Sequence, residues 1–499
     1  MKNIIRYAMA ALLSAGISSC SFINVDPLSE IPKDQMWQNQ RDVNAGIAEI
    51  YSSFRTALRS NYFSWGEMRS DNFVLYQELP SEFRNLILNQ MTTDLACTNW
   101  ASLYKVISNT NFAIKNIPGA DIADQALKDD YLAQAYAMRG LCYFYAVRVW
   151  GAVPVYLEPV DNIANAEIKG RTPMEEVLRD VIIPDLEMAE SLVNPSNVER
   201  KRISRAAIYC ILADAQMWLG DNEAADATID RFMAAYGSPA APKSNSKYIF
   251  EPDIVKLKNS FVNHLNGVAG DNNPTIDEYG EPNEFIFVIH QNISEAGLNN
   301  YSMIWNVYGC GMGQGSTVVL SPKLQAIYEE SVGKTPVDLR FENYLCGSKS
   351  SMESYQVHKY MANGASVNYQ DVINCETDYP VYRYTDVILM QAEIKAKLDK
   401  WQEALNLVQF VLNRAGVASK IAKISDFSTR DELVDYILDQ KQIEQVGEAK
   451  RWFDLVRNHR VVEVMNPING IDSQSQELFP INQTILDLSQ GAYEQNIGY

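Results

Sequence analysis

Two stretches of sequence decide the fold: residues 211–225 are ILADAQMWLGDNEAA, and residues 389–404 are LMQAEIKAKLDKWQEA. Both have the order helix, tight turn, helix. Equivalent positions hold matching residues, namely Ala213 and Ala392, Leu219 and Leu398, and Ala225 and Ala404. Two antiparallel helices approach closely only where small side chains separate them. We therefore expect an internal repeat of α-hairpins that stack as tetratricopeptide hairpins do.

Apolar residues recur at steps of three and four along much of the remaining chain. The first such stretch places these residues on one helix face: Val43, Ile47, Ile50, Phe54 and Leu58. Comparable stretches cover residues 95–117, 124–150, 174–192, 204–219, 223–236, 382–398, 401–415 and 431–457. The pattern predicts an all-α, predominantly helical protein with a scaffold of hairpins.

Residues 238–376 differ from the helical stretches on both sides. They are rich in Gly, Asn, Ser and Pro, and only two short elements stand out. Phe285 to Ile289 is strand-like, and a short helix begins at Ser321-Pro322. Loops of this length in a compact protein usually carry function. We interpret residues 238–376 as a loop-rich, partly β excursion that carries a binding surface.

The N-terminus has the pattern of an export signal. Lys2 and Arg6 flank the start of a short apolar run, residues 7–17, and small residues then precede Cys20. This pattern predicts a lipoprotein signal peptide at residues 1–19, with Cys20 as the lipidated first residue of the mature chain. Residues 20–36 follow as a tether. The alternative is an ordinary signal peptide beside a core cysteine.

Composition argues against nucleic-acid binding and favours a folded protein with a large core. The chain has 499 residues and a formal net charge of -19, and it contains no basic stripe of the kind that neutralises nucleic-acid phosphates. Its 47% hydrophobic content is enough for a large core. The cysteines after Cys20 are scattered without metal-ligand spacing, and no disulfide framework is predicted. They are Cys97, Cys142, Cys210, Cys310, Cys346 and Cys375.

No catalytic motif accompanies these features. The chain lacks a nucleophile elbow, a phosphate-binding loop and a dinucleotide fingerprint. Its histidines, His264, His290, His358 and His459, have no metal-site spacing. An acidic group at Asp277, Glu278 and Glu281 lacks the alternating order of a calcium loop. We therefore predict neither enzyme activity nor a cofactor or metal.

The stretch from Leu433 to Arg460, predicted as one helix, carries the most specific motif. It resembles the signature of the RagB/SusD family: Glu444, Glu448, Arg451, Trp452, Phe453, Asp454, Leu455 and Arg457. Agreement extends to Asp26-Pro27 with Trp37, Asp42, Gly46 and Tyr51; Arg139 with Tyr143, Phe144, Arg148, Gly151 and Pro154; Arg202 to Ser204 with Ala206-Ala207; Tyr384 to Glu393; and the terminal Gln495 to Tyr499. Departures include Gln440-Lys441 in place of Glu-Arg and Ala449 in place of glycine.

We interpret the charged residues of this motif as structural. They recur at three- and four-residue steps, where opposite charges attract, and Trp452 and Phe453 are expected to dock into the neighbouring hairpin. Catalysis by Glu444 and Glu448 is the alternative. Catalytic carboxylates lie on opposite sides of a cleft that holds the substrate. Two carboxylates on the same face of one helix cannot flank a substrate in this way.

The resemblance implies an outer-membrane nutrient-binding lipoprotein that delivers an oligosaccharide to a SusC-like TonB-dependent transporter. It implies a SusD-like helical region at residues 37–237, a variable region at 238–376 and a C-terminal SusD/RagB region at 377–499. The tether has no acidic residue between Ser21 and Val25, so display on the cell surface rests on the family alone. A peptide-binding receptor and a helical-repeat adaptor without a nutrient ligand are the alternatives.

Sugar binding requires exposed aromatic faces, because the C–H surface of a pyranose stacks on an aromatic ring. Most tryptophans fall in the predicted scaffold, whereas Trp65 and Trp305 lie in loop-like surroundings. The resemblance implies that ligand is bound by loops from similar parts of the chain. We therefore predict aromatic contacts from Trp305, Tyr308, Trp65 and Tyr76, with polar partners Arg69, Asp71, Asn72 and Asn306. The alternative for each of them is that its side chain only anchors its own loop.

Overall fold

The computed structural model describes residues 36–75, 81–160, 167–244, 246–263, 284–291, 302–308, 318–331, 334–348, 351–360 and 377–499. Most of these residues are helical, as the sequence predicts. Cys20 and the predicted tether up to residue 35 lie outside this part. Within the described ranges, no helix combines the length and the apolar character that crossing a bilayer requires.

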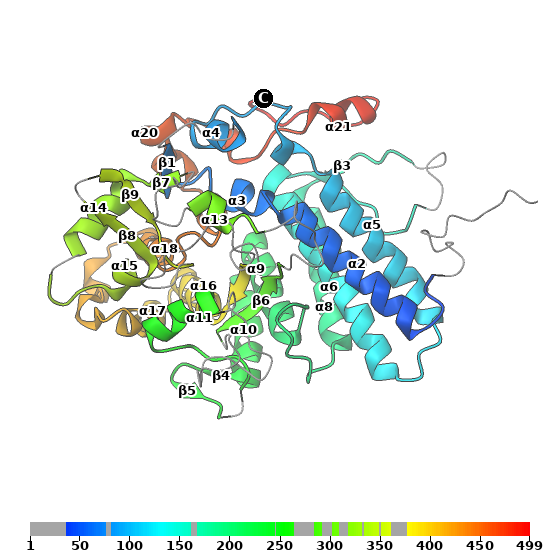
Figure 1. Ribbon diagram of the computed structural model, residues 1–499, viewed down its shortest axis with the longest axis horizontal. Coiled ribbons are helices and arrows are strands. Elements are labelled where there is room, and N and C mark those ends of the chain that lie inside the picture. The colour runs from blue at the N-terminus through cyan, green and yellow to red at the C-terminus, as the bar shows by residue number, and fades with distance from the viewer. Residues whose placement is uncertain are drawn as a thin grey trace, which may run out of the picture.

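Long helices of the N-terminal region lie side by side as a bundle (Figure 1). They are α2 (Gln40–Leu58), α5 (Ala101–Asn116), α6 (Gln125–Trp150) and α8 (Ile183–Leu192). The Asn39 side chain caps α2, and the Asp124 side chain caps α6 by accepting from the backbone N–H of Leu127. A short helix α7 (Met174–Val177) and a π-helical segment at residues 178–182 lead into α8.

The predicted repeat forms two α-hairpins. The first consists of α9 (Arg205–Leu219) and α10 (Asn222–Tyr236), and the second of α16 (Tyr384–Lys397) and α17 (Trp401–Arg414). The small residues at the matched positions are fully buried: Ala213, Ala225, Ala392 and Ala404. The sequence-based prediction of paired helices is therefore confirmed.

The two hairpins stack on each other although a long segment separates them in sequence. Helix α10 packs against α16, which also packs against α18 (Arg430–Glu444). Across the α10–α16 contact, Lys395 Nζ lies 2.8 Å from Asp226 Oδ2, and Gln391 donates to Asp230 Oδ1 at 3.1 Å. Stacking thus buries helix faces that neither hairpin covers alone.

The C-terminal region corrects one prediction, because residues 433–460 do not form a single helix. Helix α18 ends at Glu444, and α19 (Arg451–Arg457) and α20 (Val461–Asn469) follow. Gly447 has φ 78° and Ala449 has φ 55°, and an α-helix cannot continue through the left-handed region. The turn between α18 and α19 changes the direction of the chain, so the second half of the motif lies on a separate helix.

Short strands join segments that are distant in sequence. The predicted strand β6 (Phe285–Ile289) pairs antiparallel with β10 (Tyr379–Arg383), and β1 (Phe73–Leu75) pairs with β7 (Val318–Leu320). The predicted short helix is α14 (Pro322–Ser331). Smaller hairpins are β8 (Leu345–Ser348) with β9 (Ser351–Val357), β2 (Val153–Pro154) with β3 (Arg171–Thr172), and β4 (Gly237–Ser238) with β5 (Ala241–Pro242).

The remaining helices are short. They are α3 (Asn61–Gly66), α4 (Ser81–Ile87), α11 (Ile254–Asn263), α13 (Ile304–Tyr308), α15 (Leu339–Tyr344) and α21 (Gln483–Leu488). Helices α14 and α15 lie with β8 and β9 on the side of the molecule away from the α2–α5–α6 bundle (Figure 1). Between these two sides lie α3 and α13. These two helices contain four of the residues predicted to contact ligand.

Candidate functional site

The structure brings two predicted parts of the binding surface together. Strand β1 ends at Leu75, directly before Tyr76, and α13 contains position 305. Both elements lie against β7. The rings of Phe73 and Tyr308 stack with 5.5 Å between their centroids. The backbone of α13 is therefore fixed beside the strand that leads to residue 76.

Helix α13 is anchored along one face. Ile304, Val307 and Tyr308, at helical spacings of three and four, are buried. Residues 305 and 306 occupy the other positions of the same turn. The side chains of Trp305 and Asn306, and the whole of Tyr76, lie outside the described part of the chain. These three residues stay predictions as ligand contacts.

Tyr308 is not a ligand contact, which corrects the sequence-based prediction. Its ring is buried among Phe63, Phe73 and Tyr360, with centroid distances of 5.6, 5.5 and 6.1 Å. Burial raises the pKa of its hydroxyl well above the usual value. A ring enclosed in this way offers no face to a sugar, and its role is to hold α13 in place.

The prediction for Trp65 is also wrong. Its side chain has 0% of its surface exposed. The indole N–H donates to the carbonyl oxygen of Cys97 at 2.8 Å, and the ring packs edge-on against Trp150 at 5.3 Å. The loop-like sequence around Trp65 is the short helix α3, which the bundle and the C-terminal region cover. Trp65 belongs to the core.

The predicted polar partners Arg69, Asp71 and Asn72 are buried and bind the C-terminal region instead of a ligand. Arg69 donates to the carbonyl oxygen of Glu477 at 3.0 Å, and its guanidinium lies 4.1 Å from the centre of the Trp452 ring. Asp71 pairs with Arg451, whose Nε is 2.7 Å away. Asn72 accepts a hydrogen bond from Gln442 at 2.9 Å.

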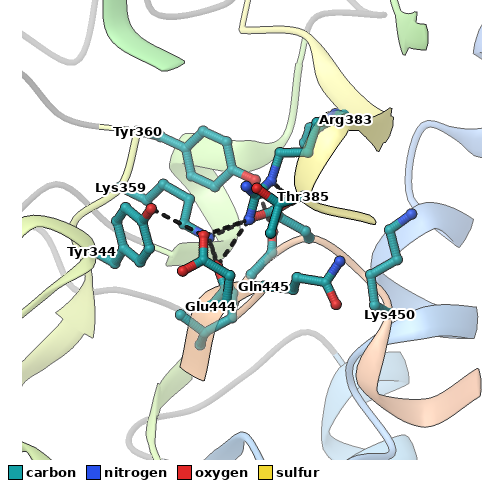
Figure 2. A network of polar contacts seen from close by, with 12 residues as sticks. Tyr344, Lys359, Tyr360, Arg383, Thr385, Glu444, Gln445 and Lys450 are labelled. Atoms are coloured by element: carbon teal, nitrogen blue, oxygen red, sulfur yellow. Dashed lines mark hydrogen bonds and ion pairs between the residues drawn. The ribbon is translucent and has the colours of Figure 1, made fainter. Parts of the chain in front are cut away.

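A buried network of charged groups lies between α18 and β10, around Arg383 (Figure 2). Arg383 contacts three carboxylates, those of Glu284, Glu444 and Glu448, at 3.0, 3.0 and 2.8 Å. Arg414 adds pairs with Glu444 at 2.8 Å and with Glu284 at 3.1 Å. Lys359 pairs with Glu448 and donates to the carbonyl oxygen of Glu444. Three cations thus balance three carboxylates.

The protonation of this network follows from its pairing. Burial alone raises the pKa of Glu448, but Arg383 and Lys359 outweigh it and lower that pKa to about 2. The pKa of Glu444 is likewise lowered by Arg414 and Arg383 against the effect of burial. Burial lowers the pKa of Lys359, although Glu448 opposes the shift. Both glutamates of the signature are therefore held as enclosed, neutralised anions.

This arrangement fits the structural interpretation of the signature. A carboxylate with a pKa near 2 is a poor general base at neutral pH, and no substrate reaches a group without exposed surface. Phe453 docks edge-on against Trp218 of α9, at 6.5 Å between ring centroids, as predicted, whereas the Trp452 ring lies 4.1 Å from the Arg69 guanidinium. Arg457 pairs with Asp454 and with Glu393 of α16, each at 2.7 Å.

Sequence reasoning missed four members of the network, Glu284, Lys359, Arg383 and Arg414. Glu284 and Lys359 come from the loop-rich region, where no periodicity indicates burial. Only the strand-like run that begins at Phe285 marks the neighbourhood of Glu284. The acidic residues Asp277, Glu278 and Glu281 lie outside the described residues.

The described part of the chain holds no cluster of three or more His, Cys, Asp or Glu residues that fits a metal ion. Cys97, Cys142 and Cys210 are buried free thiols. Burial raises the pKa of each of these thiols well above the usual value. They act as small apolar groups of the core.

Comparison with known families gives two matches that together cover most of the chain. Residues 21–216 match the model described as "Starch-binding associating with outer membrane". Residues 342–499 match the model of the SusD family. The second match contains the Glu444–Arg457 signature, and the first contains the α2–α5–α6 bundle.

Whole-chain relatives agree with these matches. "SusD-like protein P38" of Formosa agariphila is 27% identical over 98% of this chain and 97% of its own length. "SusD-like protein P25" of the same organism is 24% identical over 94% of this chain and 92% of its own. A structure named "Laminarin binding SusD-like protein" superposes with a TM-score of 0.73 at 19% identity, covering 93% of this chain and 100% of its own. "Surface glycan-binding protein A from Bacteroides thetaiotaomicron" gives 0.71 at 17% identity, covering 93% and 100%.

Proposed function

The chain belongs to the SusD family, and from this premise we propose that it captures an oligosaccharide and delivers it to a SusC-like TonB-dependent transporter. Members of this family are binding proteins associated with the outer membrane. Capture and delivery require no catalysis, because binding energy alone can favour a closed complex over an open one.

The observation that carries this proposal is the anchoring of α13 beside β1. Buried Tyr308 and Phe73 lock the two elements together. Rigid support of this kind lowers the ordering cost of binding, since the contact residues are already in place. We propose that Trp305 supplies a stacking surface for a sugar ring, with Asn306 and Tyr76 as neighbouring contacts.

Sugar is the proposed ligand class because of the relatives. One structural relative is named for binding laminarin, another is named as a surface glycan-binding protein, and the matching family model is described as starch-binding. A peptide ligand remains the rival. A peptide ligand requires a different surface on the protein from a sugar, namely a row of backbone hydrogen-bonding groups and not an exposed aromatic ring.

We place the protein on the outer membrane, held by a lipid on Cys20 through the tether at residues 20–36. A Cys20→Ser variant tests this placement. It is expected to leave the membrane fraction and to lose acyl labelling, while a Cys97→Ser variant keeps both. Unchanged membrane attachment of Cys20→Ser contradicts the proposed lipid anchor. Copurification of a barrel transporter with the wild-type protein from detergent extracts tests the proposed partner.

Ligand screening of the full mature chain, made soluble by Cys20→Ser, tests the central proposal. An array of neutral and acidic oligosaccharides and a peptide library are compared, and hits are measured by calorimetry. We expect heat with at least one oligosaccharide and none with the peptides. Binding of peptides alone would mean that the ligand is a peptide and not a glycan. Binding of neither set favours an adaptor without a nutrient ligand.

A further inference from the structure

A cavity of about 340 Å³ lies beside α2, and residues other than the predicted sugar contacts line it. Its wall consists of the C-terminal half of α2, the segment 199–202 and the end of β6. The lining residues that matter here are Tyr51, Arg55, Glu199, Lys201, Arg202 and His290. Its volume lies in the range of small-ligand sites, about 300–1,000 Å³. We call it the cationic cavity.

The charge of its lining is opposite to that of the whole chain. Three permanent cations, Arg55, Lys201 and Arg202, face one carboxylate, Glu199, in a protein of net charge -19. A further carboxylate, that of Asp378, lies 3.0 Å from Nδ1 of His290. It also accepts a hydrogen bond from the backbone N–H of Gln291 at 2.7 Å. Asp378 is thereby bound into the wall. A concentration of cations within a strongly acidic protein favours an anionic ligand.

The geometry places a guanidinium next to an aromatic ring. Arg202 donates to the side-chain oxygen of Asn44 at 3.3 Å, and its guanidinium carbon lies 6.0 Å from the centre of the Tyr51 ring. The Tyr51 hydroxyl donates to Gln134 at 3.3 Å and accepts the backbone N–H of Ile203 at 2.9 Å. These two hydrogen bonds fix the position of the Tyr51 ring. The Asn44 amide that Arg202 contacts is neutral, so it does not neutralise the guanidinium charge.

Arg55, four residues after Tyr51 on α2, is also held in place. Arg55 is buried and its Nη1 lies 3.5 Å from the carbonyl oxygen of His290, so α2 is tied to the end of β6. Tyr51, Arg55 and Arg202 all line the cavity, so an anion inside it lies among these side chains. Guanidinium groups bind carboxylate and sulfate oxygens through paired hydrogen bonds, which makes arginine the suitable residue for either group.

We propose that the cationic cavity binds an anionic sugar residue, with its carboxylate or sulfate group on Arg202 and its ring against Tyr51. This inference rests on the proposed glycan-binding function and names a chemical class of glycan for it: acidic polysaccharides that carry uronate or sulfate-ester groups. Neutral glycans make no use of this lining.

The cavity and α13 border the same end of α2. His290 lies in the cavity wall, and the described chain resumes at Ser302, where the backbone N–H of Met303 donates to the Tyr379 hydroxyl at 2.7 Å. That hydroxyl donates in turn to the carbonyl oxygen of Arg59 at 3.1 Å. One rigid helix end thus supports both the base of the proposed stacking residue and the cationic cavity.

Matched acidic and neutral oligosaccharides test the inference. Oligogalacturonate is compared with its methyl ester, and sulfated galactan oligosaccharides with their desulfated forms, by calorimetry on the full mature chain. We expect the acidic member of at least one pair to bind about tenfold more tightly. Raising NaCl from about 0.05 to about 0.5 M reduces that preference. The two pairs distinguish a carboxylate from a sulfate as the recognised group.

Arg202→Gln is the decisive variant, because Arg202 is partly exposed and its loss leaves no buried charge. It is expected to abolish the acidic preference and to keep the wild-type melting temperature. Arg430→Gln, at an exposed arginine on α18, is the matched control and keeps the preference. Equal binding of acidic and neutral members, or a preference that survives Arg202→Gln, overturns the inference while the proposed glycan binding stands. Silence with every oligosaccharide overturns both.

Discussion

Arg451 and Asp71, 380 residues apart in sequence, form a buried two-bond ion pair, with Arg451 Nε 2.7 Å from Oδ1 and Nη2 3.1 Å from Oδ2. The pair joins the C-terminal signature to the segment that carries α3 and β1. Burial raises the pKa of Asp71, but Arg451 and Lys323 outweigh it and lower that pKa to about 2. The pair is therefore fully ionised at neutral pH and contributes to holding α3 against the C-terminal region.

Asp71→Asn is expected to lower the free energy of unfolding by about 3 kcal/mol, because it leaves the Arg451 guanidinium buried without its carboxylate. Chemical denaturation at pH 7 measures this loss. Because Asp71 has a lowered pKa, the difference from wild type is present above pH 3.8 and shrinks as the pH falls toward 2.

The control for this variant is Asp439→Asn. Asp439 is the other carboxylate that Lys323 contacts, at 3.2 Å, and 57% of its side chain is exposed. Its loss changes the unfolding free energy by less than about 1 kcal/mol. Equal effects of the two variants contradict a structural role for the Arg451–Asp71 pair. Glycan affinity per folded molecule stays unchanged in both, since neither residue contacts ligand.

Arg383→Met tests the network of Figure 2. The substitution leaves three buried carboxylates facing only Lys359 and Arg414. We expect the free energy of unfolding to fall by about 3–5 kcal/mol. The matched control is Lys105→Met, which removes an exposed pair with Glu49 and costs less than about 1 kcal/mol. A loss for Arg383→Met as small as that of the control shows that the network adds no stability.

Glu67 gives a pH-dependent prediction of opposite sign to that for Asp71. Burial raises the pKa of Glu67 from 4.5 to about 7, although hydrogen bonds from Asn72 and the backbone oppose the shift. The folded protein thus retains a proton that the unfolded chain releases. The stability linked to this proton is complete below pH 4.5 and is lost as the pH rises through 7.

Glu67→Gln carries no ionisable group and removes this dependence. Between pH 5 and pH 8.5, the wild-type unfolding free energy is expected to fall relative to that of the variant, by an amount on the order of 3 kcal/mol. Denaturation curves at several pH values measure the difference. Parallel pH profiles of wild type and variant contradict the raised pKa.

Ala449→Gly puts a glycine at a left-handed position in the turn after α18. Ala449 has φ 55°, where a Cβ atom is unfavourable. The variant is expected to gain about 0.5–1 kcal/mol despite the greater freedom of glycine in the unfolded chain. Ala234→Gly, at an exposed position within α10, is the control and loses about 1 kcal/mol. Losses in both variants contradict the strained turn.

The scaffold was predictable from sequence because its signals are local. Helix periodicity and the matched small residues Ala213 and Ala392 identify the hairpins, and the apolar run at 285–289 identifies β6. The break at 445–450 was not predictable in the same way. Charged residues continue at helical spacing across it, and alanine, which is left-handed at position 449, is by itself a strong helix former.

The candidate site was less predictable, because burial by distant segments decides which side chains a ligand reaches. Trp65 and Arg69 lie in a stretch with loop-like composition, yet the carbonyl groups of Cys97 and Glu477 satisfy them within the core. The family resemblance implied ligand-binding loops in this part of the chain, whereas the contacts of Trp65 and Arg69 are structural. Trp305 remains the sequence-based prediction on which ligand binding rests.

Calorimetric titration of Trp305→Ala with the tightest oligosaccharide found by screening tests the proposed capture of glycan most directly. The account predicts a loss of at least about tenfold in affinity with an unchanged melting temperature, and no loss per folded molecule for Trp65→Phe. Wild-type affinity in Trp305→Ala would contradict the account, because the aromatic surface proposed to hold the sugar would then play no part in binding.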